Sequence, residues 1–122
     1  MPGYVTNIER ETQDNDDFRH VLFTADHVQL VLMTLRPGED IGLETHSDID
    51  QFIRVESGTA TAVLDGEESS LGDGDAIVIP AGTEHNVTNT ADTDPLRLYT
   101  LYSPPAHPDG TVQATKPEDD SH

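Results

Sequence analysis

Apolar and polar residues alternate with a period of two along most of the chain, which is the pattern of β-strands. Within residues 27–36 both sets of alternate positions are largely apolar: Val28 and Leu30 lie on one face, and Val31 and Met33 lie on the other. We expect this segment to be a strand that is buried on both faces. The other expected strands are 18–24, 51–56, 59–64, 76–79, 85–90 and 96–102.

Turn sequences that contain proline or glycine separate these strands. Proline fixes φ at a value that turns use, and glycine readily adopts positive φ, so these stretches can reverse the chain. No segment between them shows a helical period. Many short strands joined by turns predict an all-β protein, either a sandwich or a barrel. The turn stretches are 36–39, 57–58, 65–66, 72–74 and 80–82.

The two ends of the chain differ from this central part. Residues 9–17 are acidic and polar, so we expect residues 1–17 to form an N-terminal arm or loop. From Ser103 onward the sequence is rich in proline, which a central strand excludes, and we expect an extended arm over 104–122. Because a chain of 122 residues supports one hydrophobic core, residues 1–122 are expected to form a single domain.

The composition limits the chemistry and suggests a subunit contact. Only 34% of residues are hydrophobic and 5% are aromatic, so the core is modest and is expected to gain from burying a face in a homodimer. The chain has no cysteine, so any metal must use nitrogen and oxygen ligands. The polar N-terminal stretch lacks the apolar segment of a signal peptide, and no run reaches transmembrane length. We therefore expect a cytoplasmic protein.

The charge of the chain is strongly negative. There are 24 Asp and Glu against 6 Lys and Arg, which gives a formal net charge of −18. Such a surface repels phosphate backbones and anionic headgroups, so neither nucleic acid nor a membrane is an expected partner. Molar salt would screen this self-repulsion, and we therefore expect a halophilic source with a salt-rich cytosol. The acidity is a feature of the surface that faces the solvent, and it does not indicate which reaction the protein catalyses.

A spaced motif begins at Gly74. It continues after five intervening residues with Pro80, then with Gly82 and His85, and ends after three further intervening residues at Asn89. Pro80 and Gly82 suit a tight turn, after which His85 is expected to begin a returning strand and to point into a barrel. This spacing resembles the second signature of the cupin family in full.

The preceding stretch resembles the first cupin signature in spacing and departs from it in two residue types. The family pattern has glycine, histidine, histidine, glutamate and glycine, and the sequence has at those intervals Gly38, Glu44, His46, Gln51 and Gly58. Glutamate thus replaces the first histidine, and glutamine replaces the glutamate. The usual three histidines and one carboxylate become two histidines, one carboxylate and one neutral amide.

The resemblance implies a double-stranded β-helix, or jelly-roll barrel, with one divalent metal ion near its wider mouth. Glu44 and His46 are two residues apart on one expected strand and so share a face. Gln51 has the parity of the inward-facing residues, and His85 comes from the neighbouring hairpin. We expect Glu44, His46, Gln51 and His85 to be the metal ligands. Two histidines and a carboxylate suit Fe(II), and Mn, Zn, Ni and Co are also compatible.

Other polar residues are given simpler interpretations. His20 and His27 lie outside both motifs and are interpreted as surface or structural residues. His107, in the proline-rich arm, is interpreted as a packing residue. The candidates for substrate contact or for a dimer interface, between which parity cannot choose, are Arg54, Arg97, Tyr99 and Tyr102.

The expected function is a metal-dependent cupin enzyme, most plausibly of the oxygenase type, that acts on a small organic molecule. The sequence indicates no catalytic residue beyond the metal ligands. One alternative is a non-catalytic module that binds a metal or a small ligand. A second alternative is a metal-free sugar epimerase or isomerase, which needs a buried acid and base. Because one fold serves many reactions, the motifs do not choose among these functions.

Overall fold

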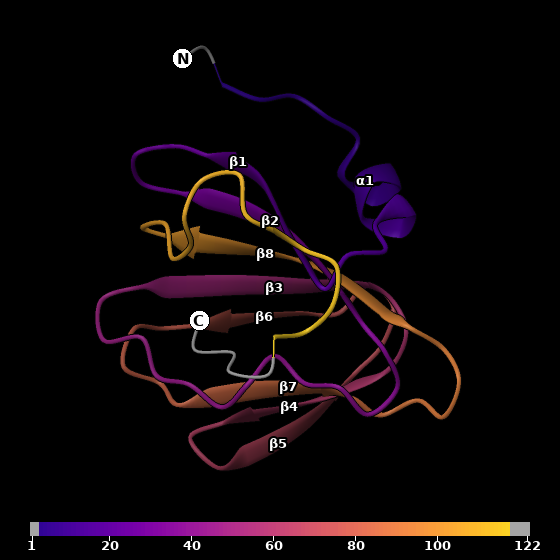
Figure 1. The fold of residues 1–122 in the computed structure, drawn as a ribbon. Helices are drawn as coiled ribbons and strands as arrows, with labels where there is room; N and C mark the ends of the chain where they lie inside the picture. Colours follow the sequence, from indigo (N-terminus) through magenta and orange to yellow (C-terminus); the bar gives the residue numbers. More distant parts are fainter. Residues whose placement is uncertain (1–2, 118–122) are drawn as a thin grey trace.

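A computed structural model describes residues 3–117 as two antiparallel sheets that pack face to face (Figure 1). The elements within this part are α1 (Ile8–Asp14), β1 (Arg19–Thr24), β2 (Gln29–Leu35), β3 (Asp50–Ser57), β4 (Ala60–Leu64), β5 (Glu67–Leu71), β6 (Ala76–Ile79), β7 (His85–Asn89), β8 (Leu96–Ser103) and β9 (Val112–Gln113). One sheet has the strand order β6-β3-β8-β2-β1-β9 and the other has the order β5-β4-β7. The expected all-β jelly-roll fold is confirmed.

The core lies between the two sheets and is built from alternate residues. In β3 the buried residues Ile53 and Val55 alternate with less buried ones, and β8 alternates in the same way from Leu96 to Tyr102. In β2 nearly every residue is buried, as its two apolar faces predict. This strand lies between β1 and β8, and α1 contacts it as well.

Helix α1 differs from the loop or frayed arm expected at residues 9–17. The side chain of Asn7 caps the helix by accepting a hydrogen bond from the backbone N–H of Arg10. Glu9 and Glu11 lie in the first turn, where the helix dipole favours negative charge. The helix has seven residues and buries only Thr12, so it leaves no apolar period in the sequence.

Strand β5 was not among the expected strands. Its sequence is polar, and only Leu71 is buried, because β5 is an edge strand that pairs with β4 alone. The turn before it supplied a signal: Asp65 and Gly66 both have positive φ, as a two-residue hairpin turn requires. Asp-Gly between β-prone segments is a strong indicator of such a hairpin.

Gly58 ends β3 in a conformation that other residues rarely adopt. Its φ is +114°, and a Cβ atom built there would lie 2.9 Å from the carbonyl oxygen of Pro95. The glycine therefore permits both the turn and the close approach of the chain that enters β8. This gives a physical reason for the last glycine of the first motif.

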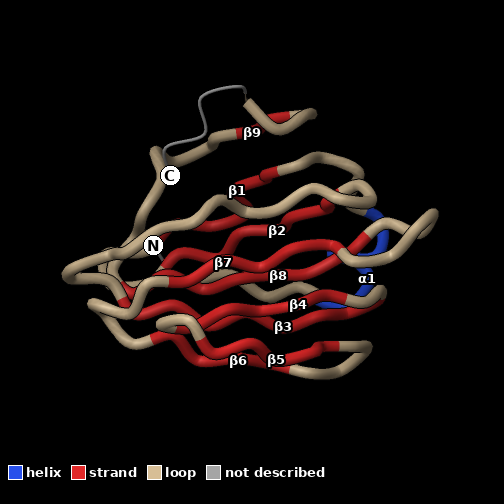
Figure 2. The backbone as a smooth tube through the Cα atoms, turned by 90° about the horizontal axis from the view of Figure 1, so that it is seen from below, coloured by secondary structure: helices blue, strands red, loops and turns tan. Residues whose placement is uncertain are grey.

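The segment after β8 returns along the six-stranded sheet. It carries the short strand β9, which pairs with β1 at the edge of the sheet (Figure 2). Residues 118–122 of the expected arm lie outside the described residues. Within residues 3–117 no helix is long and apolar enough to cross a membrane.

Candidate metal centre

The predicted ligands lie at the end of the barrel where β8 ends and where β3 and β7 begin, on the left in Figure 1. Gln51 is near the start of β3, and His85 is the first residue of β7. Glu44 and His46 precede β3 in an irregular segment rather than on one strand, which corrects the expected local structure. Glu44 nevertheless pairs with His85 in an isolated bridge, with backbone N···O distances of 3.0 and 2.8 Å.

The turn of the second motif also fixes the segment that carries His46. The backbone N–H of Gly82 donates a 2.7 Å hydrogen bond to the carbonyl oxygen of His46. The backbone N–H of the preceding residue, Ala81, donates a 2.8 Å hydrogen bond to a carboxylate oxygen of Asp50. The two motifs are therefore joined by backbone contacts, which bring residues that are far apart in sequence to the same end of the barrel.

The side chains of Glu44 and His46 meet inside this end of the barrel. Glu44 Oε1 lies 3.1 Å from His46 Nε2, and these side chains are only 14% and 10% exposed. Burial lowers the pKa of His46, and the neighbouring His85 lowers it further, while Asp48 acts in the opposite direction. His46 is therefore held as the neutral imidazole that a metal ion needs.

His85 presents an available lone pair to the interior. It is only 1% exposed, and its ring lies 5.7 Å from the ring of His46, centroid to centroid. Its Nδ1 atom is 2.9 Å from the carbonyl oxygen of Thr83, which only a protonated nitrogen can contact as a donor. The other nitrogen, Nε2, is buried and has no hydrogen-bond partner. This tautomer is the one that a metal-binding histidine adopts.

Gln51 presents a buried oxygen in the same way. It is 3% exposed, and its Nε2 donates a 3.0 Å hydrogen bond to the hydroxyl of Thr100. Its Oε1 atom is buried without a partner. A buried amide oxygen without a hydrogen-bond partner lowers the free energy of unfolding by about 1–3 kcal/mol. Such an atom in a protein interior therefore needs an explanation.

These donors are close together and not yet arranged around a common point. Among residues 3–117 no three histidine, cysteine, aspartate or glutamate side chains form a group that could hold a metal ion as they stand. The cluster contains only two histidines and one carboxylate, and its further donor is the amide of Gln51.

Comparison with known proteins supplies the family. The Cupin domain family model matches residues 31–102, which contain both motifs. The chain belongs to the cupin family.

Several relatives resemble this cupin along much of its length. The uncharacterized protein YrkC of Bacillus subtilis is 49% identical over 119 residues, which cover 93% of this chain and 63% of YrkC. The chain thus spans less than two thirds of that relative. The crystal structure of a Bacillus halodurans protein is 48% identical, covers 93% of this chain and 89% of that one, and superposes with a TM-score of 0.89. A quercetin 2,3-dioxygenase of Bacillus subtilis is 34% identical over 84 residues, 69% of this chain and 25% of the enzyme.

One of the four candidate substrate residues of this cupin faces the donors. Tyr102 is buried, and its ring contacts that of His46 edge-on at a centroid distance of 6.1 Å. In the β3–β8 ladder Tyr102 is also directly opposite Gln51. Tyr102 therefore adjoins two of the four predicted ligands.

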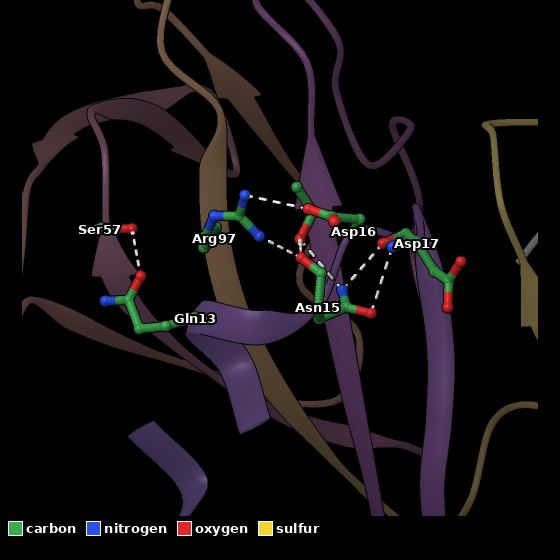
Figure 3. A network of polar contacts seen from close by, with 7 residues as sticks. Gln13, Asn15, Asp16, Asp17, Ser57 and Arg97 are labelled. Carbon is green, nitrogen blue, oxygen red and sulfur yellow. Dashed lines mark hydrogen bonds and ion pairs between the residues drawn. The ribbon is translucent and has the colours of Figure 1, made fainter. Parts of the chain in front are cut away.

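The other three candidates lie on the outer face of the sheet, away from the donors. Arg54 is paired with Glu56 at 3.4 Å, and the ring of Tyr99 packs beside that of Phe52. Arg97 binds the segment that follows α1, through the carbonyl oxygen of Asn15 and the carboxylate of Asp16 (Figure 3). For Arg54, Arg97 and Tyr99 a role in substrate contact or in a dimer interface stays a prediction.

The same contacts explain how α1 is attached. Asn15 is buried, its amide donates to the Thr34 hydroxyl of β2, and its carbonyl oxygen accepts from that hydroxyl. The Ser57 hydroxyl donates to Gln13 at the other side of the helix (Figure 3). Arg97 thus holds an element that the sequence pattern did not predict, and this explains why parity alone could not assign it.

The three remaining histidines within residues 3–117 divide into two kinds. His20 is partly exposed and lies 3.6 Å from Asp17, and His27 is exposed, in agreement with their interpretation as surface or structural residues. His107 packs edge-on against Tyr102 at 5.1 Å. His107 is therefore a packing residue, as the sequence interpretation has it. The sequence did not indicate that this packing occurs beside the candidate site.

Proposed function

We propose that this cupin binds one divalent transition metal ion through Glu44, His46, His85 and Gln51, and that it is an enzyme of the oxygenase type acting on a small organic molecule. A bound ion of this kind supplies a Lewis-acidic and redox-capable centre. The donor set favours Fe(II), with Mn, Zn, Ni and Co as further candidates. The 34% identity to a quercetin 2,3-dioxygenase supports the oxygenase assignment.

The observation that carries the metal proposal is the pair of buried, unpartnered acceptors. His85 Nε2 and Gln51 Oε1 each keep an unused lone pair inside the barrel. Buried polar atoms are almost always hydrogen-bonded, and an isolated one is costly. A cation would satisfy both acceptors at once, and they cannot satisfy each other.

Glu44 and His46 fit the same occupant. Glu44 Oε1 and His46 Nε2 lie 3.1 Å apart, so both side chains bring a ligand atom to the same place. A metal ion can accept both atoms, and its binding releases any proton that either of them carries. Glu44 contributes the one negative charge among the four ligands and offsets part of the dication's charge.

The proposal is tested by elemental analysis of protein purified without an affinity tag. The expected result is about one divalent ion per chain, most of which is lost in His85→Ala. His27→Ala serves as the matched control, because His27 is exposed and outside both motifs, and it is expected to retain the ion. Equal metal content in the wild type and in His85→Ala would refute the assignment.

An enzyme also needs an open coordination position, whereas a closed binding module does not. Loading the protein with Co(II) and adding azide tests this difference, because azide entering the coordination sphere changes the visible absorption of the metal. The expected result is a saturable change. A spectrum that azide leaves unaltered would support the non-catalytic binding module instead.

The contact between Glu44 and His46 favours a second candidate, a metal-free epimerase or isomerase. A buried carboxylate next to an imidazole is an acid and base pair that can move a proton on a sugar. The metal analysis separates the two candidates: this alternative expects no stoichiometric metal in the wild-type protein. It also leaves the two orphaned acceptors of His85 and Gln51 unexplained.

A further inference from the structure

A row of polar side chains crosses the six-stranded sheet at the end that carries the candidate site. Gln51, Tyr102 and Gln29 are direct neighbours on β3, β8 and β2, and all three are buried. The next row of inward-facing neighbours is mostly apolar and consists of Ile53, Thr100 and Val31. The polar row is therefore confined to this end of the barrel.

Gln29 clamps the segment that follows β8. Its Oε1 accepts hydrogen bonds from the backbone N–H groups of Ala106, at 3.1 Å, and His107, at 3.0 Å. Its Nε2 donates to the carbonyl oxygen of His107 at 2.8 Å and to Thr24 at 2.9 Å. The backbone of His107 is thus fixed on both sides by one fully buried side chain.

The clamp places the ring of His107 against Tyr102. The two rings meet at a centroid distance of 5.1 Å and an angle of 80°. Tyr102 in turn meets His46 at 6.1 Å and 83°, and His46 meets His85 at 5.7 Å. A continuous row of rings therefore runs from the C-terminal segment to the donors of the proposed metal centre.

We propose that Tyr102 contacts the ligand bound at the proposed metal centre and that His107, held by Gln29, positions Tyr102. This inference rests on the proposed metal site. Tyr102 is suited to the role because it adjoins His46 through its ring and Gln51 across the ladder. His107 acts through Tyr102, since its ring packs on the phenol from the C-terminal segment.

The charges of the site indicate the class of ligand. A dication with the single carboxylate of Glu44 leaves one net positive charge within the set of four ligands, and Asp48, the other carboxylate that acts on His46, is exposed to solvent. An uncompensated charge in a barrel interior is costly, and a monoanionic ligand removes it. A phenol hydroxyl donates well to an anionic oxygen. The expected ligand is therefore a small organic carboxylate.

The test uses Co(II)-loaded protein titrated with acetate and followed by visible absorption. Tyr102→Phe removes the hydroxyl and keeps the ring, and it is expected to weaken acetate binding about tenfold while changing Co(II) affinity less than twofold. His107→Ala is expected to weaken acetate binding in the same direction. His107→Phe keeps a ring against Tyr102 and is expected to restore most of the acetate affinity.

A double variant separates positioning from mere stability. If His107 acts through the hydroxyl of Tyr102, adding His107→Ala to Tyr102→Phe causes no further loss of acetate affinity. Val112→Ala is the matched control, because Val112 is exposed in the same C-terminal segment and is expected to leave acetate binding unchanged. A purely structural role for His107 would lower the melting temperature and leave acetate affinity as it is.

The outcomes for the two proposals differ. Wild-type protein that binds no Co(II) overturns the metal site and this inference with it. Protein that binds Co(II) and azide but shows the same acetate affinity in Tyr102→Phe overturns this inference alone. Additive losses in the double variant overturn the positioning role of His107, and the absence of acetate binding to the wild type overturns the ligand class.

Discussion

Replacing Gln51 by methionine should have little effect on the metal-free protein and should destabilise the metal-loaded protein. Methionine has a similar length and volume and lacks the amide. In the metal-free protein the change removes the orphaned Oε1 atom, which is worth about 1–3 kcal/mol, and loses the hydrogen bond to Thr100, worth about 0.5–1.5 kcal/mol. The buried hydroxyl of Thr100 then loses its partner as well. The gain at Oε1 and the losses at Thr100 are of similar size, so the net free energy of unfolding should change by less than about 1 kcal/mol.

With metal present the same change removes a ligand. An ion at 100 times its dissociation constant stabilises the folded chain by about 2.7 kcal/mol. If losing Gln51 weakens binding about tenfold, that stabilisation falls by about 1.4 kcal/mol. The melting temperature of the loaded variant should then lie roughly 5 °C below the value expected from its metal-free stability.

The assay is thermal unfolding in excess EDTA and in excess Co(II), followed by circular dichroism. Gln29→Met provides the matched control, since Gln29 is a buried glutamine in the same row whose amide is fully hydrogen-bonded. This control should lose about 2–4 kcal/mol under both conditions, because it leaves buried backbone N–H groups without partners. Equal destabilisation by Gln51→Met in EDTA and in Co(II) would show that Gln51 is structural and not a ligand.

Three further results are expected. Gly58→Ala should lower the free energy of unfolding by about 1–2 kcal/mol more than Gly66→Ala does, as measured in urea. Both glycines have positive φ, but only at Gly58 would the new Cβ atom lie 2.9 Å from a carbonyl oxygen. Equal losses for the two variants would contradict the close approach. The melting temperature should fall as NaCl is lowered from about 1 M to about 0.01 M, because screening of the −18 charge weakens as the Debye length grows; a constant value would argue against a halophilic source. Burial raises the pKa of Asp40, but the hydrogen bonds that it accepts, above all the one from Lys116, outweigh burial and lower the pKa overall. The stability that this pair contributes is therefore present above about pH 4 and is lost as the pH falls through the lowered pKa. Lys116→Met should therefore cost less than about 1 kcal/mol at pH 7, and this cost should shrink as the pH falls through the lowered pKa of Asp40, measured by urea unfolding across pH.

The strands that could be predicted are those with at least one face in the core. In β8 every second residue from Leu96 to Tyr102 is buried, and the alternation is visible in the sequence. In β5 only Leu71 is buried, because β5 lies at the edge of its sheet. Such a strand keeps its backbone pairing but shows no alternation of apolar and polar residues. Helix α1 depends on a cap and on contacts with β2, β3 and β8, none of which leaves an apolar period.

The candidate site was predicted from spacing, and its surroundings were not. The motifs identified Gln51 and His85 as inward-facing, and both are buried with an acceptor directed into the protein. Gln29 was not singled out, although a glutamine among apolar residues of a doubly buried strand is itself unusual. Gln29 binds the backbone of Ala106 and His107, which lie 77 and 78 positions away in the sequence. A local sequence pattern cannot predict contacts over such a separation.

The exchange of donor types between Glu44 and Gln51 has a physical explanation in their different surroundings. Gln51 is 3% exposed inside the ladder between β6 and β8, where an ionised carboxylate without a metal would be costly to bury. Glu44 lies in the irregular segment, has a side chain that is 14% exposed, and contacts His46, which can share a proton with it. The one anionic donor is thus at the position that tolerates a charge in the metal-free protein, and the neutral donor is at the position that does not. A chain arranged in this way can fold without a metal, and at the proposed centre it would still offer an ion one negative charge.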